Sequence, residues 1–298
     1  ATEEKYESTS NIEQARGFGR LVGPHHVEVE TEGQHLRLEG RSIVIATGSR
    51  PRRPGFLPWD SPLLVTSDEL FEAEDLPDRL LILGGGPLGC EFATAFAELG
   101  TSVALVEQRA ELLGKVAPSA RAAAAEALTE RGVELHLGRQ LSSLTDEGGR
   151  LRAELDEGQE ISADRALIAV GRTPNLQDIG LETAGLEADE NGILRVDDQC
   201  RTSVEHIFAV GDVADPRKHS HLAERMGTVA GDVVAGGHLR EDRRFVPIVI
   251  YTHPQVACVG VCGEAPHDDT EPCETVRYEF GGSGTARLYE ADRGSLEL

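Results

Sequence analysis

A short glycine-rich segment between an apolar strand and a helix is the feature that most constrains the fold of this chain. Residues 79–84 read RLLILG, residues 84–89 read GGGPLG, and residues 102–107 read SVALVE, with a helical pattern over 87–99. In a G-x-G-x-x-G placed in this way, the first glycine makes the tight turn, the second lets the backbone approach a pyrophosphate, and the third lets helix and strand pack closely. The pattern predicts a βαβ unit that binds a dinucleotide at the helix N-terminus.

An acidic residue ends the second strand of this unit. Glu107 lies 18 residues beyond Gly89, where a carboxylate can accept hydrogen bonds from both ribose hydroxyls of adenosine. A carboxylate there repels a 2′-phosphate, which favours NAD over NADP, although Arg109, two residues later, weakens this preference. The alternative is a glycine-rich turn without a ligand, and the agreement of strand, glycines, helix and acid argues against it.

Three more apolar strands end in small or polar residues. They lie in IVIATGSRP (43–51), LIAVGRTPN (167–175) and TSVEHIFAVGDVA (202–214). Open α/β sheets bind ligands at the carboxyl ends of their strands, and Asp212 is well placed there to accept hydrogen bonds from sugar-like hydroxyls. Core strands that end in plain turns, with the aspartate as a cap, are the alternative for each.

Taken in this order, the segments resemble the FAD-dependent pyridine nucleotide-disulfide oxidoreductases, in the branch of dihydrolipoyl dehydrogenase and mercuric reductase. The resemblance extends over GFGRLVGPHHVEV near the start and VPIVIYTHPQVACVG near the end. It implies an α/β fold of Rossmann-type FAD- and NAD-binding domains, with parallel sheets, small antiparallel insertions and the start of an α+β dimerisation domain. The implied division is a partial FAD domain at 1–53, a crossover at 54–77, an NAD domain at 78–172, a return to the FAD domain at 173–242 and a partial dimerisation domain at 243–298.

The resemblance also assigns cofactor-binding positions. The residues that match FAD-binding positions of the family are Gly19, Thr47, Gly48, Ser49, Asp212, Lys218, His219, Ser220 and His221. The residues that match NAD-binding positions are Gly84, Gly85, Gly86, Pro87, Leu88, Gly89, Cys90, Glu91, Glu107, Leu141 and Gly171. Glu91 resembles a glutamate that pairs with a lysine near the flavin, and that lysine would precede residue 1.

The family's redox disulfide and catalytic histidine have no counterpart in this sequence, so no catalytic residue is assigned and the chain is interpreted as an internal fragment. The implied parent is a homodimeric enzyme that passes electrons between NAD(H), FAD and a disulfide- or dithiol-linked substrate, either a small molecule or a lipoyl group. Two alternatives stay open. One is a catalytically incomplete NAD-binding module, and the other is a dehydrogenase that uses nicotinamide alone.

Charge and cysteine content limit the remaining functions. The chain has 52 acidic and 29 basic residues, a net charge of −23, and only three lysines among 298 residues. Such a surface argues against nucleic acid or an anionic membrane as partner and hints at a high-salt source. Without an apolar span or signal peptide we expect a cytoplasmic protein. His253, Cys258, Cys262, His267 and Cys273 match no standard zinc spacing, so no metal site is predicted.

Overall fold

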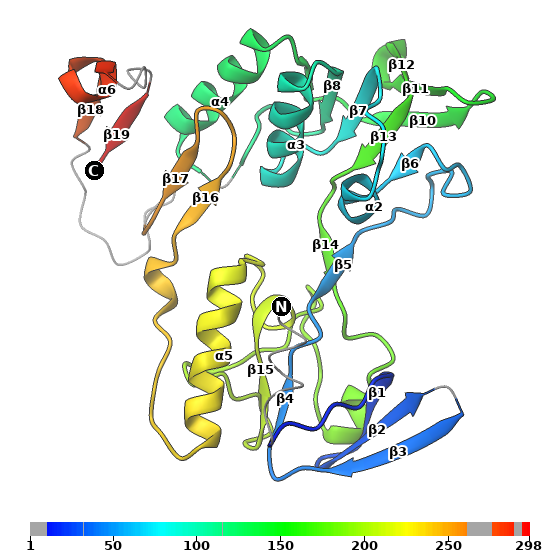
Figure 1. Ribbon diagram of the computed structural model, residues 1–298, viewed down its shortest axis with the longest axis vertical. Helices are drawn as coiled ribbons and strands as arrows, with labels where there is room; N and C mark the ends of the chain where they lie inside the picture. The colour runs from blue at the N-terminus through cyan, green and yellow to red at the C-terminus, as the bar shows by residue number, and fades with distance from the viewer. Residues whose placement is uncertain (1–10, 32, 115, 261–275, 289–293) are drawn as a thin grey trace. The chain divides into compact units, whose positions relative to one another are not determined.

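The computed structural model describes residues 11–31, 33–114, 116–260, 276–288 and 294–298. The chain divides into two compact units (Figure 1). The first unit consists of Ala1–Arg50 and Thr173–Arg243, and the second of Pro51–Arg172 and Arg244–Leu298. Each unit therefore combines segments that lie far apart in the sequence.

A parallel five-stranded sheet forms the centre of the second unit. Its order is β6, β13, β7, β8, β9. The strands are β6 (Leu64–Val65), β13 (Arg165–Ile168), β7 (Arg79–Leu83), β8 (Ser102–Glu107) and β9 (Glu134–Leu137). β7 and β8 read as continuous apolar runs because both faces of a parallel sheet are covered. The βαβ unit predicted from the sequence is present here, and the mixed α/β class with a parallel sheet is confirmed.

Two helices cover one face of this sheet and three antiparallel strands cover the other. Ile82 and Leu105 pack with residues of α3 (Pro87–Glu98) and α4 (Pro118–Glu130). Leu81 and Ala104, the alternate positions on the same strands, pack with β10 (Leu141–Asp146), β11 (Leu151–Leu155) and β12 (Glu160–Ala163). Alternation of side chains along a strand produces these two separate cores.

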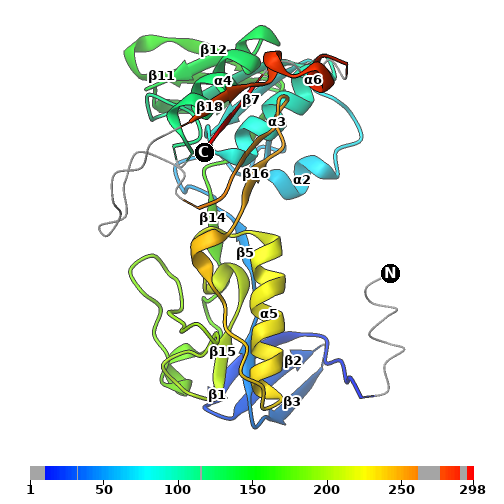
Figure 2. The ribbon, with the colours of Figure 1, turned by 90° about the vertical axis from the view of Figure 1, so that its left-hand side faces the viewer.

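A short helix and two hairpins complete the second unit. The helix is α2 (Ser67–Phe71), and the hairpin of β16 (Ile248–Ile250) and β17 (Val256–Cys258) lies against α3 (Figure 2). The sequence predicts longer strands over 245–251 and 255–261. The first is shorter because a 3-10 turn occupies Arg243–Phe245 and Pro247 has no N–H to donate. The last elements are β18 (Arg277–Glu279), α6 (Gly284–Leu288) and β19 (Ser295–Glu297).

The first unit contains an antiparallel three-stranded sheet, a parallel strand pair and one long helix. The sheet consists of β1 (Phe18–Gly23), β2 (His26–Thr31) and β3 (Gln34–Glu39), and the pair consists of β4 (Ile43–Ile45) and β15 (Ile207–Ala209). The helix is α5 (Ser220–Val234), which buries Leu222, Met226, Val229 and Val233 at helical spacing. β5 (Ser49–Pro51) pairs with β14 (Arg172–Pro174) where the chain passes from one unit to the other.

Candidate functional site

The glycine loop follows β7 and bends at two glycines that no other residue could replace without backbone movement. Gly84 has φ of 112°, a left-handed conformation that favours glycine. A Cβ on Gly89 would lie 1.9 Å from the carbonyl oxygen of Gly84. These contacts explain the first and third glycines of the motif, because the turn and the helix touch through backbone atoms alone.

The second glycine of the motif faces open space. Gly86 is the N-cap of α3, and no atom lies within 4 Å of a Cβ built on it. Pro87 occupies the first turn of the helix, where a missing N–H costs nothing. The free backbone N–H groups at this end of a 12-residue helix are suited to hold an anionic group.

Glu107 is held in place by two backbone groups. Its Oε2 accepts a hydrogen bond of 2.7 Å from the N–H of Gly85, and its Oε1 accepts one of 2.8 Å from the N–H of Arg109. The carboxylate is thus fixed beside the glycine loop, and each oxygen keeps a lone pair for another donor. The Arg109 side chain lies along Gly114, where its Nη1 would be 2.8 Å from a Cβ.

Cys90 lies in the first turn of α3 and is completely buried. Burial raises the pKa of its thiol to about 12, and the charges of Glu107 and Glu91 act in the same direction. The Sγ atom donates to the carbonyl oxygen of Gly85 at 3.6 Å. The Cys90 side chain packs in the core formed by α3 and the sheet.

Three further positions predicted to line NAD lie on neighbouring elements of the same unit. Leu141 begins β10, and Gly171 follows β13 with φ of 109°. Glu91 lies in α3, and its Oε1 accepts a hydrogen bond of 2.9 Å from the backbone N–H of Tyr251. This contact attaches the β16–β17 hairpin to the helix that begins at the glycine loop.

In the first unit, two predicted FAD-binding residues meet although 163 positions separate them. The Ser49 hydroxyl donates to Oδ2 of Asp212 at 2.5 Å. The pairing of β4 with β15 brings them together, since each residue follows the carboxyl end of its strand. A carboxylate and a hydroxyl at paired strand ends form a polar site of the kind that binds sugar-like hydroxyls.

Asn175 belongs to this region and was not singled out from the sequence. Its N–H donates to the carbonyl oxygen of Gly48 at 2.9 Å, and its Nδ2 donates to that of Thr47 at 3.0 Å. The Thr47 hydroxyl donates back to the Asn175 carbonyl oxygen at 2.7 Å. Asn175 therefore fixes the A-T-G turn, and only its place in the second strand-end segment, R-T-P-N, could have drawn attention to it.

The remaining predicted FAD positions lie around α5 and on β1. Lys218 has φ of 57°, His219 is the N-cap of α5, and Ser220 is its first residue. The rings of His219 and His221 stack at 5.3 Å between centroids. Gly19 lies on β1, in a different sheet from β4 and β15, and pairs with Val29.

A buried ion pair holds the segment between Asp212 and α5. The carboxylate of Asp215 accepts hydrogen bonds from the backbone N, Nε and Nη2 of Arg217 at 2.9, 2.9 and 2.8 Å. Burial opposes ionisation of Asp215, but these hydrogen bonds outweigh it and lower the pKa of the carboxyl group. The Nη1 of Arg217 donates to the carbonyl oxygen of Arg243 at 2.8 Å, so the segment is fixed from two sides.

The described residues form neither a metal-binding cluster nor a membrane-spanning helix. Cys262, His267 and Cys273 lie outside the described residues. Among the residues that are described, no three His, Cys, Asp or Glu side chains are grouped to hold a metal ion. None of the helices in the described parts of the chain combines the length and the apolarity that a membrane span requires.

The architecture and the glycine loop define a Rossmann-type nucleotide-binding protein. A family model described as pyridine nucleotide-disulphide oxidoreductase matches residues 3–227. The chain therefore belongs to this family, as the sequence motifs predict.

Curated relatives and solved structures agree with this assignment. Dihydrolipoyl dehydrogenase of Pseudomonas aeruginosa is 33% identical over 288 residues, which are 96% of this chain and 62% of the relative. That of Haloferax volcanii is 37% identical over 267 residues, 87% of this chain and 56% of the relative. The HOCl-induced flavoprotein disulfide reductase RclA from Escherichia coli has a TM-score of 0.89 at 25% identity, covering 99% of this chain and 68% of that one. The chain thus spans only 62% and 56% of the length of these two curated relatives.

Proposed function

We propose that this chain is the nucleotide-binding part of a flavin-dependent oxidoreductase that passes electrons between NAD(H) and a disulfide- or dithiol-linked substrate. The proposed enzyme resembles dihydrolipoyl dehydrogenase or mercuric reductase. It acts as a homodimer on a small molecule or a lipoyl group. We propose a cytoplasmic location for it. A bound flavin supplies the redox chemistry, and the protein supplies binding and orientation.

The observation that carries the proposal is the position of Glu107 beside the glycine loop. The N–H groups of Gly85 and Arg109 orient its carboxylate, which accepts the ribose hydroxyls of adenosine in the proposed complex. The open face of Gly86 and the N-terminus of α3 hold the pyrophosphate. A 2′-phosphate meets a negative charge at Glu107, so NAD is the proposed nucleotide and NADP the weaker one.

The proposed FAD-binding residues of the first unit likewise accept hydroxyl groups of a cofactor. Ser49 occupies Oδ2 of Asp212, which leaves Oδ1 to accept a hydroxyl of the ribityl chain. Thr47 and Gly48 are held by Asn175 and present backbone groups beside it. These hydrogen bonds restrict the side chains of the cluster, which lowers the entropy lost when a flavin binds.

Calorimetric titration with NADH and NADPH tests the nucleotide site in the complete gene product. We expect NADH to bind more tightly than NADPH, and Glu107→Gln to weaken NADH about tenfold, a loss of about 1.4 kcal/mol. Glu126→Gln, at an exposed position of α4, is the control of equal charge change and leaves both affinities unchanged. Equal affinities for the two nucleotides, or a Glu107→Gln variant that binds NADH normally, would refute the role of Glu107.

The visible absorbance of the purified complete protein tests the flavin separately. A flavin spectrum is expected. A protein that binds NADH but neither carries nor takes up FAD is a dehydrogenase that uses nicotinamide alone, or an NAD-binding module.

A further inference from the structure

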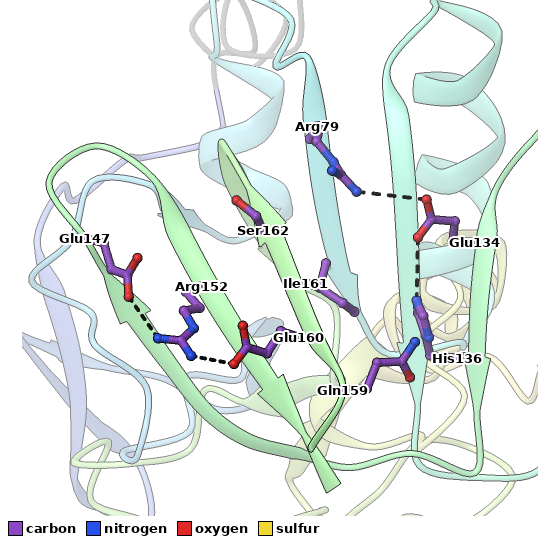
Figure 3. A pocket seen from close by; sticks show the side chains of 9 residues that line it. All are labelled: Arg79, Glu134, His136, Glu147, Arg152, Gln159, Glu160, Ile161 and Ser162. Carbon is purple, nitrogen blue, oxygen red and sulfur yellow. Dashed lines mark hydrogen bonds and ion pairs between the residues drawn. The ribbon is translucent and has the colours of Figure 1, made fainter. Parts of the chain in front are cut away.

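A polar cavity of about 360 Å³ lies in the second unit, between the edge strand β9 and the edge strand β12. Figure 3 shows the side chains that surround it, which come from β7, β9, β11 and β12 and from the turns at Glu147 and Gln159. Nine residues line it: Arg79, Glu134, His136, Glu147, Arg152, Gln159, Glu160, Ile161 and Ser162. None of these positions belongs to the predicted nucleotide or flavin sites.

One side of the cavity is saturated by its own ion pairs. Arg152 contacts Glu147 at 3.4 Å and also pairs with Glu160, so its guanidinium is occupied by two carboxylates. These three side chains satisfy one another without a ligand. The hydrogen-bonding capacity that a ligand can use therefore lies on the opposite wall.

On that opposite wall, Glu134 lies between two donors and is hydrogen-bonded to neither. Its Oε1 is 3.9 Å from Nη2 of Arg79, and its Oε2 is 3.9 Å from Nε2 of His136. Both distances are too long for hydrogen bonds. Nε2 of His136 is buried and has no hydrogen-bond partner among the described residues, a costly state for a polar atom.

Each of these two gaps has the right width for one oxygen atom. An atom that makes hydrogen bonds of about 2.8 Å to both sides of such a gap joins them at an angle of about 90°. It must accept from Arg79 or His136 and donate to Glu134 at the same time. A hydroxyl group does both with one atom, whereas a carboxylate only accepts and an ammonium only donates.

We propose that this cavity binds a small neutral polyol through a vicinal diol, with Glu134 accepting both hydroxyls and Arg79 and His136 each donating to one. Three carboxylates among the lining residues disfavour an anion, and two guanidinium groups disfavour a cation. No aromatic ring other than the imidazole of His136 lines the cavity, so a nucleobase would have no stacking platform. The ligand class is therefore a sugar or sugar alcohol without a base.

The cavity is separate from the nucleotide site within the same sheet. Arg79 and Glu134 are the first residues of β7 and β9, whereas Gly84 and Glu107 stand at the carboxyl ends of β7 and β8. Glu134 and His136 pair with Ala104 and Val106, which face the antiparallel strands. Glu107 instead pairs with Leu137, which packs on the face covered by α3 and α4, so the two sites lie on opposite faces of the sheet. NADH and the polyol are thus expected to bind independently.

Saturation-transfer NMR on the full chain tests the proposal with xylitol as the probe. We expect saturable transfer to xylitol in the millimolar range, and little or none to 1,5-pentanediol, which has the same number of carbons but no vicinal diol. Glu134→Gln should weaken xylitol binding at least about fivefold, because an amide accepts through one atom only. His136→Phe removes Nε2 and is expected to act in the same direction.

The charge-matched control is Glu126→Gln, which leaves xylitol binding unchanged. NADH at saturation should also leave the xylitol signal unchanged, and competition between them would place the polyol at the nucleotide site and overturn the proposal. Equal transfer to the two probes, or normal xylitol binding by Glu134→Gln, would overturn it as well. If His136→Phe fails to fold, Glu134→Gln still decides, since that side chain is half exposed.

Discussion

The hydroxyl of Ser49 donates a hydrogen bond of 2.5 Å to the carboxylate of Asp212, across 163 positions of sequence. The bond connects residues that follow two parallel strands, β4 and β15, and orients the carboxylate. A preoriented acceptor loses little freedom on binding, which favours affinity. The pair is therefore the best place to test the flavin-binding part of the proposal.

Replacement of Asp212 by Asn should weaken FAD binding by the complete protein about tenfold or more, because a charged acceptor forms the stronger hydrogen bonds to hydroxyl groups. Ser49→Ala should weaken it less, since the carboxylate remains but is no longer oriented. Flavin fluorescence during titration of the apoprotein measures both. Asp60→Asn, an exposed position of the second unit, is the control. FAD affinity that is unchanged in Asp212→Asn would remove this residue from the flavin site.

The glycine loop allows binding to be separated from folding. The backbone φ at Gly86 is −77°, which alanine adopts readily, and no atom lies within 4 Å of a Cβ built there. Gly86→Ala should therefore fold normally. Its methyl group occupies the open face where the pyrophosphate is proposed to lie, and NADH affinity should fall about tenfold or more.

Gly89→Ala should behave differently, because its Cβ would lie 1.9 Å from the Gly84 carbonyl oxygen. The backbone must shift, and we expect a loss of about 1–3 kcal/mol in the free energy of unfolding together with loss of NADH binding. Thermal unfolding and NADH titration of the two variants give the comparison. A Gly86→Ala variant with normal NADH affinity would mean that the nucleotide does not approach this glycine.

The glycine loop and the cluster around Thr47 and Asn175 show which parts of a site can be predicted from sequence. The glycine loop and Glu107 were identifiable because strand, loop, helix and acid follow one another within 30 positions, and local geometry determines their relation. Asn175 was not, because its contacts with Thr47 exist only after two distant segments pair.

Two other features, strand β10 and the cavity beside Glu134, were not predicted because their local sequence patterns are weak. The sequence indicated two antiparallel strands over 150–170, but β10 (Leu141–Asp146) is a third strand, and only its two leucines signal it. The cavity beside Glu134 draws on four strands, the turn after β10 and the residue before β12, so no single stretch of sequence could reveal it. Residue patterns predict elements well, whereas sites assembled from several elements need the fold.

The Asp215–Arg217 pair predicts a loss of stability in acid. The pKa of Asp215 is lowered in the folded protein, so ionisation of this group stabilises the fold above its unfolded pKa of about 4. This stabilisation is lost as the pH falls below about 4 and then through the lower pKa that Asp215 has in the folded protein. Asp215→Asn should reduce the free energy of unfolding by about 2 kcal/mol at pH 7, because it replaces the charged acceptor of the hydrogen bonds from Arg217.

Urea unfolding of the wild type and Asp215→Asn from pH 7 to pH 3 measures this effect. The difference between the two proteins should be constant at neutral pH and narrow below about pH 4. Glu160→Gln removes one partner of the exposed Arg152 and is the comparison, with a smaller expected loss because water screens exposed ion pairs. A difference between wild type and Asp215→Asn that stays constant down to pH 3 would show that the carboxylate charge is not what stabilises this segment.

The net charge of −23 predicts that salt stabilises the fold. Repulsion among 52 acidic groups is greater in the compact state than in the unfolded chain, and only 29 basic groups offset it. The Debye length falls from about 10 Å at 0.1 M to about 3 Å at 1 M, so potassium chloride screens this repulsion. Exposed ion pairs weaken too, but each contributes at most about 1 kcal/mol.

We therefore expect the midpoint of thermal unfolding to rise between about 0.1 M and about 1 M potassium chloride. A variant with Glu126, Glu187 and Glu190 replaced by Gln carries three fewer charges at exposed positions. It should be more stable than the wild type at low salt, and the two should converge at high salt as screening removes the difference. A salt effect of the same size in both proteins would instead assign it to stronger hydrophobic burial, which does not depend on net charge.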